Sequence, residues 1–318
     1  MTQVMRAQEK QISVKKKVMK LKKYMPLILM TLPGILYLII NNYLPMFGIV
    51  IAFKDVNFSK GILGSEWIGF KNFEYLFKTS DAFIITRNTI LYNTAFIIIN
   101  LIVAVGIAIL LNEIRNRFLS RFYQSIILLP HLISMVIVSY LAFALLSAET
   151  GFINKTILPM LGLNEISWYT ESQYWPFILT VINVWKSAGF LCVVYLAAII
   201  GIDQEYFEAA TLDGASKWKQ ILLITIPLIM PVITMMTLLA IGRIFYSDFG
   251  LFYQVPLNAG ALNSTTNVID TYVYRGLMQL GDIGMSSAAG VYQSIVGFVL
   301  VLISNYVVRK INSDNALF

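Results

Sequence analysis

Long apolar runs separated by short polar segments dominate the chain. Six of the runs are long enough for a helix to cross a bilayer, which takes about 20 apolar residues. They are approximately Tyr24–Ile51, Asn88–Leu111, Ser125–Leu146, Phe177–Ile202, Gln220–Ile241 and Gly290–Val308. We therefore predict an all-α membrane protein with six transmembrane helices. The first run contains Pro33-Gly34 and Pro45, so we expect that span to kink or break.

The overall composition agrees with this pattern. Hydrophobic residues make up 58% of the chain and charged residues 13%, against roughly 45–50% and about 25% in soluble domains. The polar segments at about 52–87, 147–176 and 242–289 contain turn residues but are too short for a catalytic domain. We predict a basic segment at 1–24, retained rather than cleaved as a signal peptide, and one transmembrane domain at 25–318.

Basic residues are distributed unevenly between the two sides of the predicted bundle. Residues 1–24, 112–121 and 203–219, with Arg309 and Lys310, fall on one side and hold 15 of the 24 Lys and Arg. The opposite side holds seven. The more basic side usually faces the cytoplasm, so we place both termini there, in a multi-pass protein of the bacterial plasma membrane. The net charge of +7 is assigned to topology and anionic lipid headgroups rather than to nucleic acid.

Catalytic and metal-binding motifs are absent from the sequence. There is no G-x-x-x-x-G-K-[ST] phosphate loop, H-E-x-x-H, G-x-S-x-G or C-x-x-C. The single cysteine is Cys192, and the single histidine, His131, is interpreted as a residue at a helix entry rather than a metal ligand. The sequence therefore predicts neither a catalytic nor a metal site, and we expect the chain not to be an enzyme.

A polar stretch rich in small residues, at about 203–227, leads directly into the fifth apolar run. Its small residues are Ala209, Ala210, Gly214 and Ala215, and its acids include Glu205, Glu208 and Asp213. Small side chains allow another backbone to approach, and carboxylates match basic groups on a partner. Gly214 is expected to bend the stretch between two short helices, with Asp213 capping the second. Two interpretations stay open: a helical knob that exchanges force with a soluble protein, or an amphipathic connector at the membrane surface.

Within this stretch, Glu208-Ala209-Ala210 is followed at fixed distances by Gly214, Ile224 and Pro227, with Ile226 where the pattern usually has leucine. The spacing resembles the EAA loop of ABC-importer permeases, E-A-A-x₃-G-x₉-I-x-L-P. In that family the loop is a coupling helix that docks in a cleft of the ATPase subunit. The resemblance implies the type I ABC-importer permease fold. It also implies a set of residues that couple to the ATPase: Glu208, Ala209, Ala210, Asp213, Gly214 and Ala215.

Other segments resemble the carbohydrate-importer permeases of the same family. Trp185 to Phe190 looks like their W-K-x-x-G-F run, Trp67 to Phe73 like an external G-x-x-N-[FY] segment, and Leu129 to Ser134 like the start of their third span. Residues 269–273 and the C-terminal end, 305–318, resemble the subgroup associated with complex oligosaccharides. The resemblance covers nearly the whole chain and implies the import of sugars, with oligosaccharides favoured.

The resemblance also implies partners. They are a second homologous permease, two cytoplasmic ATPase subunits that bind ATP and Mg²⁺, and an extracellular solute-binding protein. The chain itself is expected to bind no cofactor. In the implied cycle, ATP binding moves the docked coupling loops and switches the spans between inward-open and outward-open states.

Sugar recognition needs aromatic faces and polar groups. Candidates for the substrate path, in or beside the last three spans, are Asn183, Trp185, Lys186, Arg243, Tyr246, Asp248, Tyr292 and Gln293. Structural alternatives stay open for several of them. Lys186 could pair with an acid, Arg243 with Asp248, and Tyr292 and Gln293 could belong to an interface belt.

Two other functions remain as alternatives. A permease of the same family for peptides or phosphonates would carry the same loop, because the loop contacts the ATPase and not the cargo. A stand-alone channel or membrane scaffold would purify without an ATPase or a second permease.

Overall fold

The computed structural model describes residues 24–311 of the chain. The basic segment predicted at 1–24, apart from Tyr24, and the C-terminal end after residue 311 lie outside the described residues. Contacts divide the chain into two units, Met1–Ile51 and Ala52–Phe318, which are described separately. The domain boundary predicted near residue 25 stays a prediction.

The first unit is built around the N-terminal apolar helix. Residues 24–38 are α-helical without interruption, so the first span does not break at Pro33-Gly34. The helix continues through η1 (Ile39–Tyr43), α2 (Leu44–Met46) and η2 (Phe47–Phe53). Its geometry changes just before Pro45, where η1 is a π-helical turn. Proline has no N–H to donate, and a wider turn absorbs that loss without ending the helix.

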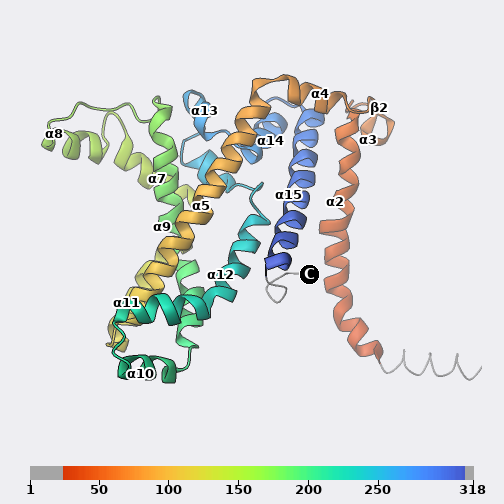
Figure 1. Ribbon diagram of the computed structural model, residues 1–318. Helices are drawn as coiled ribbons and strands as arrows, with labels where there is room; N and C mark the ends of the chain where they lie inside the picture. Colours follow the sequence, from red (N-terminus) through yellow and green to blue (C-terminus); the bar gives the residue numbers. More distant parts are fainter. Residues whose placement is uncertain (1–23, 312–318) are drawn as a thin grey trace, which may run out of the picture. The chain divides into compact units, whose positions relative to one another are not determined.

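The second unit contains the remaining long helices (Figure 1). They are α5 (Ser80–Asn112), α6 (Arg117–Leu132), α7 (Met135–Leu146), α9 (Trp175–Ile200), α12 (Ile226–Ile241) and α15 (Ile283–Ile311). The α12 helix continues N-terminally through a π-helical turn, η5 (Ile221–Thr225), and α11 (Lys217–Gln220). Within residues 24–311, five helices are long and apolar enough to cross a membrane, and α6 with α7 makes a sixth if the pair is one span. The predicted all-α membrane architecture is confirmed, with five or six spans according to how the α6–α7 pair is counted.

Short elements connect these helices. They are β1 (Lys54–Asp55), α3 (Gly61–Gly64), β2 (Glu66–Trp67), α4 (Lys71–Lys78), η3 (Ile153–Ile157), α8 (Leu158–Met160), η4 (Ser172–Tyr174), α10 (Gln204–Leu212), η6 (Gly250–Gln254), η7 (Gly260–Leu262), α13 (Asn263–Thr266) and α14 (Ile269–Met278). The two strands pair antiparallel, with Lys54 opposite Trp67 and Asp55 opposite Glu66.

The third predicted span is broken. Helices α6 and α7 meet at an angle of 95° across the two residues between them. Ser134 begins α7, because its Oγ accepts the N–H of Ile137. The continuous span predicted from Ser125 to Leu146 is therefore wrong. His131 lies in the last turn of α6 rather than at a helix entry, and the segment Leu129–Ser134 ends a helix instead of starting a span.

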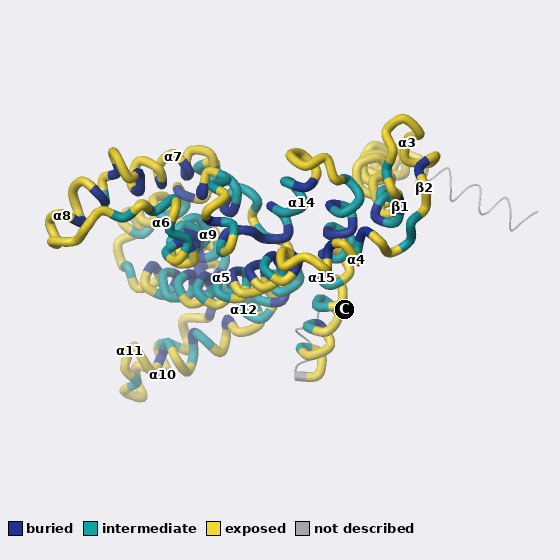
Figure 2. Tube along the Cα trace, turned by 90° about the horizontal axis from the view of Figure 1, so that it is seen from above, coloured by how far each residue is buried: buried dark blue, intermediate teal, exposed yellow. Residues whose placement is uncertain are grey.

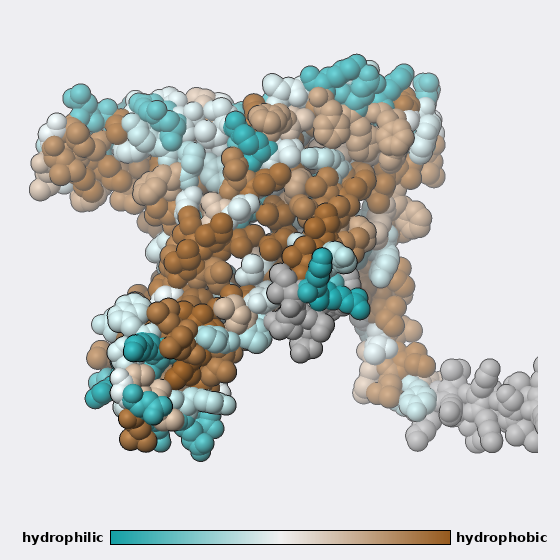
Figure 3. Space-filling view, in the orientation of Figure 1, coloured by the Kyte–Doolittle hydropathy of each residue, from teal (hydrophilic) through white to brown (hydrophobic). Residues whose placement is uncertain are grey.

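Small and aliphatic side chains allow the central helices to approach closely. Ala104 and Ala108 of α5 pack against Cys192, Tyr195 and Leu196 of α9 in one buried cluster. Figure 2 shows buried positions recurring along both helices. In Figure 3, apolar side chains cover the middle of the helices, and hydrophilic side chains gather toward the ends. This distribution is typical of a bundle that crosses a bilayer.

The two ends of the second unit carry different segments (Figure 1). The short helix α10 lies at one end, beside α11 and the end of α5. At the opposite end lie α4, α13, α14 and an arm, residues 147–171, that contains η3 and α8. Lys217 of α11 pairs with Glu113 after α5 at 3.4 Å. The segments 112–121 and 203–219, predicted to share a side of the membrane, therefore lie together.

Candidate functional site

The polar stretch at 203–227 bends sharply at Gly214. Its φ of +74° is a left-handed conformation that glycine adopts without a Cβ penalty. The Ala215 N–H donates to Ala210 O at 2.9 Å, and the Gly214 N–H donates to Thr211 O at 3.1 Å. These two bonds are the Schellman motif that ends a helix at glycine. The predicted bend at Gly214 is confirmed.

Each helix of this stretch begins at a capping side chain. Asp203 accepts the N–H of Glu205 at 3.1 Å at the start of α10. Ser216 accepts the N–H of Lys219 at 3.5 Å at the start of α11. Asp213 was predicted to cap this second helix, and that prediction is wrong, because Asp213 lies at the C-terminal end of α10.

Contacts on the inner side fix the stretch to the bundle. Phe207 of α10 packs against the cluster that joins α5, α9 and α12. The buried Gln220 donates from Nε2 to Thr211 Oγ1 at 3.0 Å and to Ala215 O at 3.3 Å. The Lys217–Glu113 pair is exposed and contributes less than about 1 kcal/mol. Packing and the Gln220 hydrogen bonds therefore join α10 firmly to the ends of α9 and α12.

The outer side of α10 is free of such contacts. Glu205, Glu208, Ala209 and Leu212 follow helical spacing and are all exposed. Leu212 is 89% exposed, and Trp218 of α11 is 73% exposed. Large apolar side chains beside acids on a rigid projection are typical of a surface that binds another protein.

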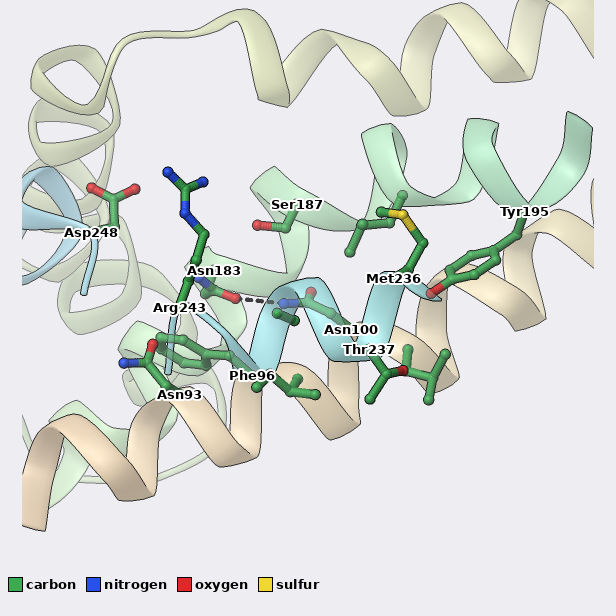
Figure 4. Close-up of a pocket in the computed structure, with 14 residues that line it drawn as sticks. Asn93, Phe96, Asn100, Asn183, Ser187, Tyr195, Met236, Thr237, Arg243 and Asp248 are labelled. Carbon is green, nitrogen blue, oxygen red and sulfur yellow. Dashed lines mark hydrogen bonds between the residues drawn. The ribbon is translucent and has the colours of Figure 1, made fainter. Parts of the chain in front are cut away.

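A cavity of about 380 Å³ lies between α5, α9 and α12 (Figure 4). Its polar lining consists of Asn93, Asn100, Asn183, Ser187, Tyr195, Thr237, Arg243 and Asp248. Asn100 Nδ2 donates to Asn183 Oδ1 at 2.8 Å, while the buried Asn100 Oδ1 accepts no hydrogen bond from any described residue. The Phe96 ring adds an aromatic face. Amides, hydroxyls and an aromatic ring together can bind the hydroxyl groups and C–H faces of a sugar.

Three predicted substrate-path residues line this cavity. Asn183 lies on α9, and Arg243 and Asp248 follow α12. Figure 4 shows Arg243 reaching into the space between Asp248 and Ser187. The alternative left open from the sequence, an Arg243–Asp248 ion pair, does not form within the described chain, and Asp248 Oδ1 accepts the N–H of Leu251 at 3.1 Å. The guanidinium of Arg243 is therefore accessible to an anionic ligand.

Three further predicted residues do not line this cavity. Trp185 borders an apolar groove between α7 and α9, and Tyr246 follows α12 with 48% of its surface exposed. Lys186 donates from Nζ to the backbone oxygens of Pro130, at 3.3 Å, and Ile133. The alternative pairing of Lys186 with an acid does not occur among the described residues, because carbonyl groups at the break in the third span accept its hydrogen bonds.

The last two predicted residues, Tyr292 and Gln293, belong to the packing around α15. The Tyr292 ring contacts Phe77 and Phe245 edge to face. Gln293 is buried and donates from Nε2 to Phe245 O at 2.6 Å and to both carboxylate oxygens of Asp270 at 3.2 Å. Burial excludes Gln293 from an interface belt.

Asp270 on α14 is a half-buried carboxylate whose described partners are neutral. It accepts the backbone N–H of Ser247 at 2.8 Å and the side-chain amide of Gln293. Burial raises the pKa of Asp270 above its usual value, and these two donors act in the opposite direction. No ion pair of the described residues includes it. Neutral donors thus connect α14 to α15 and to the segment after α12.

The contribution of α5 to the cavity was not among the predicted features. Asn93 and Asn100 stand seven residues apart, so both lie on one face of that helix. Two asparagines at this spacing inside an apolar run were a usable signal, since amides in a membrane need polar surroundings.

Comparison with known proteins places this geometry in a family. Residues 100–313 match the family model described as the binding-protein-dependent transport system inner membrane component. The polygalacturonan/rhamnogalacturonan transport system permease protein YteP of Bacillus subtilis is 36% identical, over 94% of this chain and 92% of its own. Protein LplB of the same organism is 35% identical, over 91% and 90%.

A solved structure shares the fold as well. The bacterial ABC transporter involved in import of the acidic polysaccharide alginate contains a chain that matches with a TM-score of 0.86 and 32% identity. The match covers 93% of this chain and 99% of that one. Sequence, fold and membrane helices agree, and the chain is a multi-pass membrane protein that belongs to the family of binding-protein-dependent transport system inner membrane components.

Proposed function

We propose that the chain is the permease subunit of an ATP-driven importer for acidic oligosaccharides. It would form the translocation path with a second, homologous permease, and two ATPase subunits would dock on its coupling loop, residues 203–227. An extracellular solute-binding protein would deliver the cargo. ATP and Mg²⁺ would bind to the ATPase subunits, and this chain would bind neither.

One observation carries the coupling part of the proposal: the coupling loop joins two of the three helices that line the cavity. Asn183 and Ser187 of α9 and Thr237 of α12 all face the cavity, and α10 is the connection between α9 and α12. Because Gln220 and Phe207 hold α10 rigidly, a displacement of α10 displaces both helices together. A loop built in this way can convert movement of a docked protein into a change of cavity shape.

The orientation follows from charge. The end that carries the coupling loop also carries the basic segment 112–121, and basic loops favour the cytoplasm. We therefore place α10 in the cytoplasm, within reach of an ATPase, and the arm of residues 147–171 outside.

The cavity supports an acidic sugar as cargo. Asn183, Asn100 and Ser187 offer hydrogen bonds to hydroxyl groups, and Arg243 offers a cation that forms no ion pair with a described residue. Arginine binds carboxylates in a bidentate manner. The names of two relatives point the same way, because polygalacturonan, rhamnogalacturonan and alginate are polymers with carboxylated sugars.

The test is a charge reversal on the outer face of α10. Glu208→Lys is expected to leave membrane insertion intact and to abolish both uptake and binding-protein-stimulated ATP hydrolysis in the assembled complex. Glu149→Lys is the matched control, since Glu149 is also exposed but lies on the arm at the opposite end. Normal uptake by Glu208→Lys would overturn the coupling role of the loop.

Two alternative functions have distinct outcomes. A permease for peptides would lose uptake in the same variant, but the complex would transport peptides and not oligogalacturonides. A stand-alone channel or scaffold would purify without an ATPase, so co-purification with an ATPase and a second permease separates it from the proposal.

A further inference from the structure

The run Trp185–Phe190 of α9 packs against the break in the third span. Lys186 donates from Nζ to the backbone oxygens of Pro130, at 3.3 Å, and Ile133. Both oxygens lie at the C-terminal end of α6, where carbonyl groups run out of helical donors; Pro130 O accepts the Ile133 N–H at 3.3 Å in addition to the Lys186 ammonium. A lysine at that end also interacts favourably with the helix dipole.

Two neighbours of Lys186 hold α9 against the same turn. A Cβ at Gly189 would overlap the backbone carbonyl of Ile127, so glycine is required for this close crossing of α9 and α6. Phe190 stacks on His131 with 5.1 Å between the ring centroids and 15° between the planes. We call Lys186, Gly189 and Phe190 the clamp.

The clamp accounts for the existence of a bent span in a bilayer. Backbone groups that a break releases must find partners within the protein, because lipid offers none. Ser134 caps the start of α7, and Lys186 pairs the end of α6. Conversely, a lysine inside a membrane helix requires such partners, and no ion pair of the described residues includes Lys186.

The clamp also lies between the coupling loop and the arm. Its helix, α9, carries the cavity residues Asn183 and Ser187 and leads into α10 after a short turn. On the other side of the break, α7 packs on η6 and leads into the arm. Because α9 is one continuous helix, a displacement of α10 reaches the break through Lys186.

We propose that Lys186 is a positioning residue that couples α9 to the break between α6 and α7, so that movement of the coupling loop reaches α7 and the arm. The transport consequence rests on the proposed import function. The attachment of the break to α9 does not, and it can be measured separately.

The test compares two substitutions of Lys186 in the complete complex with its ATPase, second permease and binding protein. Lys186→Met keeps an unbranched side chain, one atom shorter, but removes its hydrogen-bond donors. Lys186→Arg keeps donors. Lys155→Met is the matched control, because Lys155 lies on the arm in an exposed ion pair with Glu165. The readouts are uptake, basal and stimulated ATP hydrolysis, and backbone hydrogen exchange over residues 130–138.

The expected result is specific to a coupling role. In Lys186→Met, backbone hydrogen exchange over residues 130–138 becomes faster. Stimulated ATP hydrolysis falls by about tenfold or more, because the hydrogen bonds donated by the charged ammonium group are lost. Basal hydrolysis and the KM for uptake stay close to wild type. Lys186→Arg retains most of the stimulation, and Lys155→Met resembles wild type in every readout.

Three results would overturn the proposal. Unchanged exchange and stimulation in Lys186→Met would show that Lys186 does not hold the break. A raised KM with unchanged exchange would assign Lys186 to cargo binding instead. An equal loss of stimulated ATP hydrolysis in Lys186→Arg and Lys186→Met would show that hydrogen-bond donation by the side chain at position 186 is not what couples the two elements. If Lys186→Met does not assemble, Lys186→Gln replaces it, since its shorter amide cannot reach both carbonyl groups, and the same loss is expected.

Failure of the proposed import function can be distinguished from failure of the proposed role of Lys186. A wild-type complex without any stimulated ATP hydrolysis would overturn the import function, whereas the exchange measurement at residues 130–138 would still decide whether Lys186 holds the break.

Discussion

Asn154→Leu is expected to loosen the arm of residues 147–171. Asn154 is fully buried, and its Nδ2 donates to Ile166 O at 2.8 Å. Its Oδ1 accepts the Ile166 N–H at 3.2 Å and the Trp168 Nε1–H at 2.9 Å. Leucine fills a similar volume but leaves these three backbone and indole groups without their partner.

The magnitude follows from the number of groups left unpaired. Each buried polar group without a partner costs about 1–3 kcal/mol. Ile166 and Trp168 are half-buried, so water reaches them in part and the lower value applies to each. The free energy of local opening should therefore fall by about 3 kcal/mol, which corresponds to an increase on the order of 100-fold in the open population.

Hydrogen exchange of the amides at 164–168 in the purified complex measures this population. Lys155→Met is the matched control at the adjacent position, because it removes only the exposed Lys155–Glu165 pair, worth less than about 1 kcal/mol. Asn154→Asp keeps the acceptor oxygen, so its exchange rate should lie between those of Asn154→Leu and Lys155→Met. Exchange in Asn154→Leu within about threefold of wild type would refute the assignment of the arm's stability to these hydrogen bonds.

Three further predictions concern the coupling loop, the half-buried carboxylate of Asp270 and the cavity. Gly214→Ala places a Cβ on a residue with a φ of +74°, a conformation that disfavours side chains. The substitution should lower the unfolding free energy by about 1 kcal/mol, seen as a lower melting temperature of the complex, and should lower stimulated ATP hydrolysis. Because burial raises the pKa of Asp270, its contribution to the unfolding free energy falls as the pH rises from 3.8 through the raised value. Asp270→Asn should remove that part of the pH dependence, measured by thermal unfolding at several pH values. Arg243→Gln should raise the KM for acidic oligosaccharides by about tenfold and leave that for neutral ones unchanged, in uptake by proteoliposomes.

The positions of the spans could be predicted from the sequence because insertion into lipid depends on local composition. The predicted apolar runs coincide with the long helices to within a few residues at most ends that face α10, as at Leu111 and Ile202. The bend at Gly214 could also be predicted from the sequence, since a Schellman turn needs only a glycine after a helix. Both features are decided by residues adjacent in the chain.

The break in the third span and the cavity wall depend on contacts between distant residues. Nothing near Ile133 identifies the partner of its carbonyl group, which is Lys186 on another helix. Asn100 likewise becomes a cavity residue only when α5 packs against α9 and meets Asn183. Sequence patterns report the surroundings of a residue along one helix, whereas these sites require knowledge of which helices are neighbours.

The Gln220 hydrogen bonds have a consequence for assembly. The four residues 213–216 are already ordered before any partner arrives, through the turn at Gly214 and the side chain of Gln220. Ordering a flexible segment of that length on contact would cost about 4–8 kcal/mol of backbone entropy. A chain that presents this element already folded can therefore bind a soluble partner through a modest contact area, because none of the binding free energy is spent on ordering the segment.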